Sequence, residues 1–401
     1  MRRPTTILFG ILIAVLLAAC GGSGGGGAGA SGGRAPGALP RLIGVEAEMP
    51  YDAPVSLGVQ HATIDSVEVV PDGGEPLAGL VGDDGRTWSS DAAPEPGGSY
   101  AVTVVASDTY GTPHTLTTSF TVTGVPDSDR LTLSVQPGDG EVVGVGAPIV
   151  VRFDQSVSEQ EAVEQAMHVA SSPQVVGSWH WVNSKEVHFR PKEYWPAGTK
   201  VAVSLDLNGV QAGDGLWGGR SYDIAFEVGR SQVAQVDAAT HTMSIVVDGK
   251  TTATWNTSLG APEFATRNGT YVVLSKEDKR QMTSCNANIT CDKNSPEFYD
   301  LEVTWTVRLS WSGTFVHSAP WSEGAQGSAN VSHGCINLSD ANGHAFFDMV
   351  RYGDLVTVAN STRGPEDLVS RGDPGMADWN MPWTQYVAES ALGAEVTTDA
   401  L

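Results

Sequence analysis

The chain of 401 residues contains few cysteines and few basic residues. Four cysteines in a chain of this length exclude a small scaffold held together by many disulfides. The 23 lysines and arginines are outnumbered by 46 aspartates and glutamates, and the net charge of −23 argues against a nucleic-acid partner, which requires a clustered positive field. A hydrophobic content of 41% is sufficient for packed cores and excludes a disordered or collagen-like chain.

Long hydrophobic runs are also scarce. The clear one, Thr5 to Ala19, follows Arg2 and Arg3, and its length suits the apolar region of a signal peptide but is short for a membrane span. It ends in Leu-Ala-Ala-Cys20, which resembles a bacterial lipobox, where Cys20 becomes the lipid-modified first residue of the mature chain. A plain signal peptide with a coincidental cysteine is the alternative. We predict a lipoprotein signal over residues 1–20.

Residues 21–40 are dominated by glycine, alanine and serine, a composition typical of a flexible tether. Removal of Arg2 and Arg3 with the signal changes the net charge from −23 to −25. Because no second hydrophobic span follows, we expect the rest of the chain to lie outside the membrane. The predicted location is therefore the outer face of the cell membrane, in the cell wall or periplasmic space, with an N-terminal lipid anchor.

Residues 41–124 and 125–230 both predict all-β domains. Runs rich in β-branched residues at 100–107, 114–123 and 149–153 are separated by turns containing glycine and proline, which is typical of a β-sandwich. Residues 179–182 and 186–189 predict a hairpin in which His180 and His188 face each other as a surface pair, with a metal site as the minor alternative. Neither domain contains a nucleophile with a nearby base, so we interpret both as spacers.

Residues 231–360 predict a third domain with different features. Residues 242–255 form a hairpin with an Asp-Gly turn, and 271–274, 302–309 and 354–358 are further strands. The polar stretch 275–300 predicts a long loop, often a lid over a functional site. Ser339 can cap a helix over 340–352. The aromatic segment 361–401 is expected to pack back onto the body.

The residues with chemical potential gather around Cys335. His317 and His333 lie near it in sequence, and a thiol becomes a strong nucleophile when an imidazole favours the thiolate. Gly334 allows backbone N–H groups to approach a developing oxyanion. The predicted helix begins shortly after Cys335, and its positive end would lower the pKa of the thiol. A backbone carbonyl could fix the tautomer of the base, because no aspartate lies in the cluster.

Two other interpretations of this cluster stay open from the residues alone. An isolated cysteine is usually a small buried hydrophobic residue. His317, His333 and Cys335 could instead bind zinc, although the sequence offers no obvious fourth ligand and no Cys-x-x-Cys pair. We expect neither a metal nor a cofactor.

The run Ser-His-Gly-Cys-Ile-Asn at 332–337, preceded by His-Ser-Ala-Pro-Trp at 317–321, is similar to the signature of the L,D-transpeptidases. The whole chain resembles the multidomain lipoprotein type of mycobacteria and other actinobacteria. This resemblance implies a mainly β fold, with two immunoglobulin-like sandwiches before a YkuD-type catalytic domain. It also implies a cysteine acyl-enzyme that acts on the stem peptides of peptidoglycan.

The resemblance assigns roles to individual residues. Cys335 matches the nucleophile, His317 the general base, and the Ser318 carbonyl the group that orients this base. His333 matches the second histidine of the motif, and the N–H groups of Gly334 and Cys335 match the oxyanion hole. Positions that line the substrate pocket are matched by Tyr299, Trp321, Ser332 and Asn337.

The implied reaction has two steps. Cys335 attacks the carbonyl after the third residue of a tetrapeptide stem and expels D-Ala, and the side-chain amine of a neighbouring diaminopimelate then resolves the thioester. Carbapenems are implied to form thioesters with the same cysteine. An L,D-carboxypeptidase that uses water in the second step is the main alternative, and a non-enzymatic wall-binding lipoprotein is another.

Cys285 and Cys291 lie in the predicted lid, where many relatives lack cysteines. Outside the membrane such a pair is expected to oxidise. We predict a structural disulfide; a redox-sensitive lid or exchange with Cys335 are the alternatives.

Overall fold

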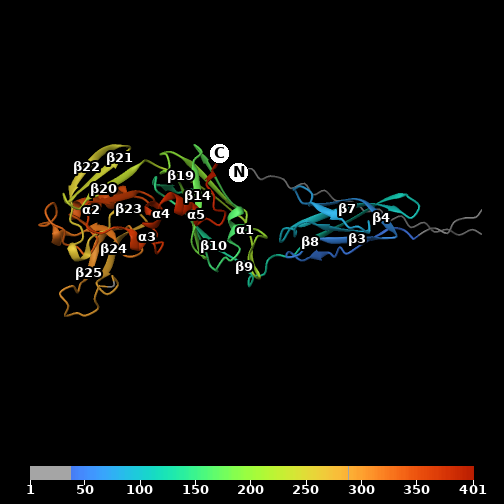
Figure 1. Cartoon of the computed structure of the whole chain (residues 1–401), viewed down its shortest axis with the longest axis horizontal. Helices are drawn as coiled ribbons and strands as arrows, with labels where there is room; N and C mark the ends of the chain where they lie inside the picture. The colour runs from blue at the N-terminus through green and yellow to red at the C-terminus, as the bar shows by residue number, and fades with distance from the viewer. Residues whose placement is uncertain (1–37, 288) are drawn as a thin grey trace, which may run out of the picture.

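Three β-rich units follow one another along the chain in the computed structural model, which describes residues 38–287 and 289–401 (Figure 1). The predicted signal, Cys20 and nearly all of the tether lie outside these residues. The fold is mainly β, as the sequence predicts. No helix in the described part of the chain is long and apolar enough to cross a membrane.

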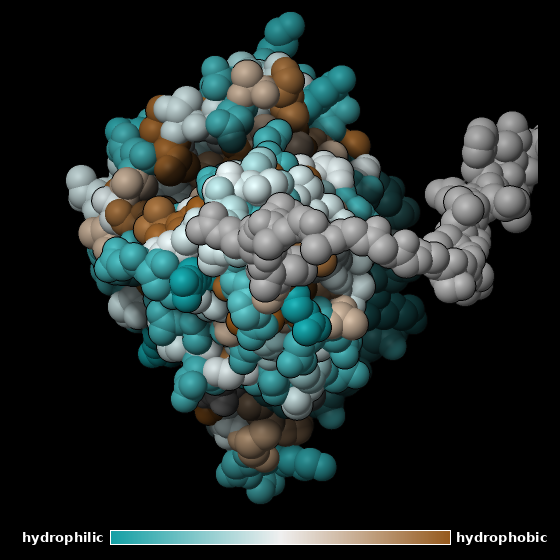
Figure 2. Space-filling view, turned by 90° about the vertical axis from the view of Figure 1, so that its right-hand side faces the viewer, coloured by the Kyte–Doolittle hydropathy of each residue, from teal (hydrophilic) through white to brown (hydrophobic). Residues whose placement is uncertain are grey.

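The first unit is a sandwich of two four-stranded sheets, ordered β1-β3-β6-β5 and β2-β8-β7-β4. Alternate residues of β7, from Tyr100 to Ala106, are buried between the sheets. Seen from this end, the molecule presents a mostly hydrophilic face with separate hydrophobic patches (Figure 2). The strands are β1 Arg41–Ile43, β2 Glu48–Met49, β3 Ser56–Gln60, β4 Ala62–Pro71, β5 Gly79–Val81, β6 Thr87–Ser90, β7 Ser99–Asp108 and β8 Pro113–Val122.

The second unit contains two five-stranded sheets, and the edge strand of each comes from the end of the chain. Their orders are β10-β12-β15-β14-β29 and β11-β19-β16-β13-β30, and a small third sheet is ordered β17-β18-β9. The elements are β9 Arg130–Leu131, β10 Leu133–Gln136, β11 Val142–Val143, β12 Ile149–Phe153, α1 Gln160–Gln165, β13 Met167–Ser172, β14 Val176–Asn183, β15 Glu186–Pro191, β16 Lys200–Leu205, β17 Gln211–Gly213, β18 Leu216–Gly218 and β19 Tyr222–Val228.

The third unit has a five-stranded sheet, β22-β21-β20-β28-β23, and a four-stranded sheet, β24-β25-β26-β27. Helix α2 packs against the second of these, contacting β25, β26 and β27. The elements are β20 Gln232–Asp237, β21 Thr242–Val247, β22 Lys250–Asn256, η1 Pro262–Phe264, β23 Gly269–Val272, β24 Ser275–Thr283, β25 Asp300–Arg308, β26 Phe315–Ser318, η2 Pro320–Ser322, β27 Ile336–Leu338, α2 Asp340–Met349 and β28 Leu355–Ala359.

The long loop predicted over 275–300 is only partly a loop, because its first residues form a strand. Residues 275–283 form strand β24, which pairs in register with β25, so the true connection is confined to residues 284–299. The prediction failed because β24 is exposed along most of its length and therefore carries charged side chains. The β24–β25 hairpin projects from the third unit with this loop at its tip (Figure 1).

The aromatic C-terminal segment runs back from the third unit and packs on the second (Figure 1). Its central contact is Arg190, whose guanidinium lies 4.6 Å from the ring centre of Trp379, 4.7 Å from that of Trp383 and 4.4 Å from that of Tyr386. The segment contains α3 Glu366–Val369, α4 Ala377–Asn380, α5 Trp383–Ala388, β29 Val396–Thr397 and β30 Asp399–Ala400.

His180 and His188 pair across the β14–β15 hairpin as predicted, but they are not on the surface. Their exposed fractions are 2% and 1%, because the C-terminal segment covers this face of the hairpin. His188 Nδ1 lies 2.8 Å from an Asp378 carboxylate oxygen, and Nε2 lies 2.8 Å from one of Glu186. These two carboxylates raise the pKa of His188 to about 9 despite its burial.

We expect the His188 ion pairs to make stability fall with pH. The folded-state pKa of about 9 lies above the ordinary histidine pKa of 6.5, so this contribution is complete below pH 6.5 and is lost as the pH rises through 9. Urea unfolding should show a decrease of about 3 kcal/mol over this window. His188→Gln should remove the slope, whereas His168→Gln, an exposed control in the same unit, should keep it. An equal slope in both variants would contradict the assignment.

Candidate active site

The candidate site is built where two neighbouring strands run parallel. Strand β26 pairs with β27 so that His317 lies beside Asn337. Side chains alternate along a strand, so His317 and Phe315 share one face of β26. Cys335 immediately precedes β27 and, by the same alternation, is on the face of Asn337. The spacing within the two motifs therefore brings thiol, imidazole and amide together.

Helix α2 packs against the opposite face of these strands. Ser339 caps it by accepting a hydrogen bond from the N–H of Asn342, and the Ser318 hydroxyl donates to Asp340 at 2.8 Å. A Cβ on Gly343 would lie 3.0 Å from the Ser318 backbone, so the glycine permits the close approach of helix and strand. The predicted helix and cap are present, although the helix ends at Met349 instead of Tyr352.

The Cys335 thiol is half-buried and protonated in this state. Loss of solvent around the thiolate raises its pKa to about 11, an effect that the nearby Phe315 backbone N–H only partly offsets. The expectation that a helix terminus lowers this pKa is wrong, because β27 separates Cys335 from the first residue of α2. Sγ lies 3.8 Å from the Gly313 carbonyl oxygen, the acceptor available to the S–H group.

His317 is a buried, neutral imidazole with a fixed tautomer. Its Nδ1 lies 2.8 Å from the Ser318 carbonyl oxygen, which can only accept, so Nδ1 carries the proton and Nε2 keeps its lone pair. Burial lowers the pKa of His317 below its ordinary value, and only 4% of the residue is exposed. A base that is already deprotonated at neutral pH therefore stands on the same face as the thiol.

His333 is held by residues that the sequence did not single out, together with Tyr299. Its Nε2 lies 2.7 Å from a carboxylate oxygen of Glu297, and its ring lies between those of Phe264, at 4.7 Å, and Tyr299, at 5.1 Å. Glu297 and Tyr299 belong to the β24–β25 loop, so this loop contacts the catalytic motif directly. The sequence signal for Glu297 was weak, because it is one of several acidic residues in a polar stretch.

Ser332 organises the backbone around Cys335. Its hydroxyl donates to the Cys335 carbonyl at 2.6 Å and accepts from the Gly334 N–H at 3.1 Å. Gly334 has φ of +117°, a conformation that favours glycine. The Gly334 N–H thus already donates to the Ser332 hydroxyl. It can donate to an oxyanion only if this hydrogen bond breaks.

The loop before β26 is positioned by the C-terminal segment. The carboxylate of Asp373 accepts from the N–H groups of Trp311, at 3.0 Å, and Ser312, at 2.8 Å. The next residue is Gly313, whose carbonyl faces Sγ. Asp373 was missed from sequence because it lies far along the chain in a segment without a catalytic motif.

Two cavities meet at Cys335. The base cavity, of about 300 Å³, contains His317, Trp321 and Asn337 in its wall. The arginine cavity, of about 860 Å³, contains Arg267, Arg363 and Arg371 in its wall. Cys335, together with His333 and Tyr299, lines both cavities. A carbonyl presented to Sγ can therefore extend in two directions.

Polar and aromatic groups of the base cavity are arranged for a ligand. Asn337 is buried; its Nδ2 donates to the Ser322 hydroxyl at 3.2 Å, and its Oδ1 meets no donor among the described residues. Trp321 is 56% exposed, with its ring 6.0 Å from that of His317. Within residues 38–287 and 289–401, no three His, Cys, Asp or Glu side chains are grouped closely enough to bind a metal, so the zinc alternative has no geometric support.

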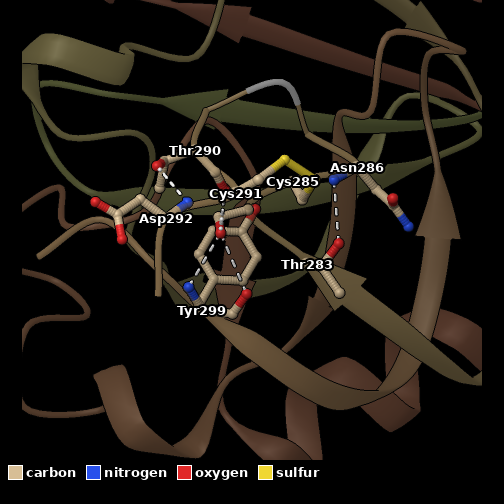
Figure 3. The surroundings of a disulfide bond; sticks show 8 residues. Thr283, Cys285, Asn286, Thr290, Cys291, Asp292 and Tyr299 are labelled. Atoms are coloured by element: carbon tan, nitrogen blue, oxygen red, sulfur yellow. Dashed lines mark hydrogen bonds between the residues drawn. A yellow bond between two sulfur atoms is a disulfide. The ribbon is translucent and has the colours of Figure 1, made fainter. Parts of the chain in front are cut away.

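The loop that carries Tyr299 is closed by a disulfide between Cys285 and Cys291 (Figure 3). Next to it, the fully buried Ser284 donates its hydroxyl to the Thr290 carbonyl at 2.8 Å and its N–H to the Tyr299 carbonyl at 3.0 Å. Figure 3 shows Tyr299 among the residues that surround the disulfide. The disulfide and Ser284 together fix where Tyr299 enters the site.

Replacing both cysteines of this disulfide with serine is expected to destabilise the loop. Opening a ring this short costs about 2 kcal/mol in the chain-entropy model, so the melting temperature of the catalytic unit should fall by about 5 °C. Differential scanning calorimetry of the ectodomain lacking residues 1–37 measures this fall in melting temperature. Ser284 is left unchanged in both proteins. Intact mass should show one free thiol in the parent; three free thiols would contradict the disulfide.

Comparison with known proteins identifies the two kinds of unit. Residues 46–211, which extend from the first sandwich into the second, match a bacterial Ig domain, and residues 231–358 match the L,D-transpeptidase catalytic domain, YkuD. The chain is 37% identical over 340 residues to L,D-transpeptidase 2 of Mycobacterium tuberculosis, which covers 85% of this chain and 81% of that protein. The chain belongs to the L,D-transpeptidase family.

A further curated relative and a solved structure agree with this assignment. L,D-transpeptidase 1 of Mycobacterium tuberculosis is 38% identical over 227 residues, covering 56% of this chain and 83% of that protein. The solved structure of the L,D-transpeptidase LdtMt1 in complex with imipenem is 37% identical and covers 58% of this chain and 99% of that one, with a TM-score of 0.51. This transpeptidase is therefore an enzyme, which sets aside the non-enzymatic alternative.

Proposed function

We propose that this transpeptidase forms a thioester through Cys335 with His317 as general base. The observation that carries the proposal is the pairing of β26 with β27, which places a neutral thiol and a neutral imidazole on one face. As Sγ attacks a stem-peptide carbonyl, the thiol proton passes to Nε2 of His317. The Ser318 carbonyl stabilises the resulting imidazolium through its bond to Nδ1.

The remaining predicted residues bind the reacting peptide. The Cys335 N–H, and the Gly334 N–H once released from Ser332, stabilise the oxyanion. The unpaired Oδ1 of Asn337 accepts an N–H of the substrate backbone. Trp321 and Tyr299 provide aromatic walls, and Glu297 keeps His333 in place beside them.

The two steps release one product each. In the first step, His317 returns its proton to the departing amine, so D-Ala leaves and the acyl group stays on Sγ. The side-chain amine of a neighbouring diaminopimelate then attacks the thioester and loses its proton to His317. An amide between two third-position residues forms, and the Cys335 thiol is regenerated.

Incubation with purified disaccharide-tetrapeptide tests this proposal. A dimer with the mass of two substrates minus one D-Ala is the expected product. Tripeptide monomer without dimer would instead establish the carboxypeptidase alternative, in which water takes the second step. If neither the dimer nor the tripeptide forms, both the transpeptidase and the carboxypeptidase proposals are contradicted.

We also propose that carbapenems acylate Cys335, because a relative with 37% identity has been solved with imipenem. Attack of Sγ on the β-lactam carbonyl opens the ring, so the adduct retains the whole mass of the drug.

We propose from the N-terminal sequence that Cys20 carries a lipid anchor and that the rest of the chain lies outside the membrane. From the order of the units, we propose that residues 41–124 and 125–230 act as spacers. On this view, residues 231–360 act on the cell wall at a distance from the membrane, and the sandwiches could alternatively bind glycan or a protein. Cys20→Ala should abolish labelling by a fatty-acid probe in cells. Undiminished labelling would contradict the anchor.

A further inference from the structure

The arginine cavity is unusual for a chain with so few basic residues. Three of the sixteen arginines of the sequence, Arg267, Arg363 and Arg371, line this one cavity beside Cys335. The net charge of −23 repels anionic ligands from the protein as a whole. A positive cluster at the nucleophile therefore attracts anionic ligands that the rest of the protein repels.

The fold builds this cluster from segments far apart in sequence. Arg267 and Arg363 are paired by an isolated parallel bridge. Arg267 holds the Asp367 carboxylate with two hydrogen bonds, of 2.6 and 2.5 Å, and Arg363 reaches the same carboxylate at 3.1 Å. These contacts lower the pKa of Asp367 to about 2, so it remains ionised.

One carboxylate does not balance three guanidinium groups. Arg371 forms no ion pair with any carboxylate among the described residues, and Arg363 is exposed with donors left over. The other acidic residue of the wall, Glu297, is already bound to His333. The cavity thus offers two guanidinium groups, those of Arg363 and Arg371, to a ligand. The ion pair between Arg267 and Asp367 positions the segment that carries them.

The position of His317 decides which part of the substrate enters this cavity. His317 lines the base cavity but not the arginine cavity. It must protonate the departing amine and later deprotonate the incoming one, so both amines occupy the base cavity. The acyl portion that remains on Sγ between the two steps then extends the other way, among the arginines.

We propose that Arg363 and Arg371 form a carboxylate-binding subsite for the retained acyl portion of the donor stem. This inference rests on the proposed thioester mechanism. Two free carboxylates of a donor stem have the required chemistry: that on the side chain of the third-position diaminopimelate, and that of the preceding glutamate, which is linked through its side chain. Guanidinium groups bind such carboxylates with charge-assisted hydrogen bonds.

Thioester formation on the ectodomain, followed by time-resolved intact mass, tests the subsite without the acceptor step. Three donors are compared: the free tetrapeptide, one amidated on diaminopimelate and one amidated on the glutamate. Arg363→Ala and Arg371→Ala should each slow acylation by the free donor by about tenfold, as expected for loss of one charged hydrogen bond. Arg371→Glu should slow it further. Whichever amidated donor is insensitive to the substitutions identifies the carboxylate that is bound.

Two controls separate binding from damage to the site. Arg220→Ala removes the same charge from the second unit, where Arg220 stacks on Tyr222, and should leave every rate unchanged. Alkylation of Cys335 by iodoacetamide, a neutral reagent, should proceed at the parent rate in all variants.

The results distinguish this inference from the mechanism on which it rests. Absence of a thioester in the parent protein with any donor would contradict the mechanism itself. A normal thioester whose rate is indifferent to Arg363 and Arg371, or slowed equally for all three donors, would overturn the subsite alone.

Discussion

Replacing Cys335 with alanine is expected to abolish acylation of the protein. The rate of adduct formation with meropenem or with a tetrapeptide donor should fall by at least about 10⁴-fold, because alanine has no sulfur atom with which to form the thioester. Intact-mass analysis of the ectodomain measures the adduct directly. The parent should gain the full mass of the carbapenem on one site.

The alanine variant is informative only if it folds. Its melting temperature should match that of the parent, because Cys335 is half-buried at the junction of two cavities and is not part of a packed core. Cys335→Ser is the matched control for shape, and it should also lose the thioester. A full carbapenem adduct on the alanine variant would assign the nucleophile to another residue.

Replacing His317 with alanine should slow acylation at neutral pH by about 10²- to 10⁴-fold. The reason is the high pKa of Cys335, about 11, which leaves almost no thiolate at pH 7 unless a base takes the proton during attack. Single-turnover acylation by the tetrapeptide, followed by mass, measures the effect. His344→Ala, on the exposed face of α2 in the same unit, is the control and should react at the parent rate.

The pH profile separates a general base from a structural role. Burial lowers the pKa of His317 below 6.5, so the parent rate should be flat around neutral pH and fall only when acid protonates the imidazole. In His317→Ala the rate should instead rise about tenfold per pH unit toward the pKa of Cys335, as thiolate forms without help. A parallel profile in the two proteins, or near-full activity of the variant at pH 7, would move the role of base elsewhere.

Local sequence was sufficient to predict the parts of the site that short motifs encode. The resemblance of residues 317–321 and 332–337 to the L,D-transpeptidase signature implied a thiol, a base and its orienting carbonyl, and the pairing of β26 with β27 places these residues side by side. The cap of α2 at Ser339 was equally local. Such features depend on residues a few positions apart, which makes them visible in the sequence.

The features that were missed depend on contacts between distant segments. Glu297, Phe264 and Asp373 reach the site only because the loop after β24, the short helix η1 and the C-terminal segment fold onto it. The pKa of Cys335 was mispredicted because desolvation depends on everything packed around the thiol. The burial of His188 likewise follows from Asp378, which lies 190 residues further along the chain.

The edge strands β29 and β30 give this chain an unusual order of assembly. They complete two sheets of the second unit, and the hydrogen bond between Ser171 and Thr398 joins residues 227 positions apart. Contacts of such long range are expected to form late, so the second sandwich should remain open along two edges until residues 396–400 have been synthesised. A protease that trims the final few residues would uncover both edges at once, and unpaired edges favour aggregation.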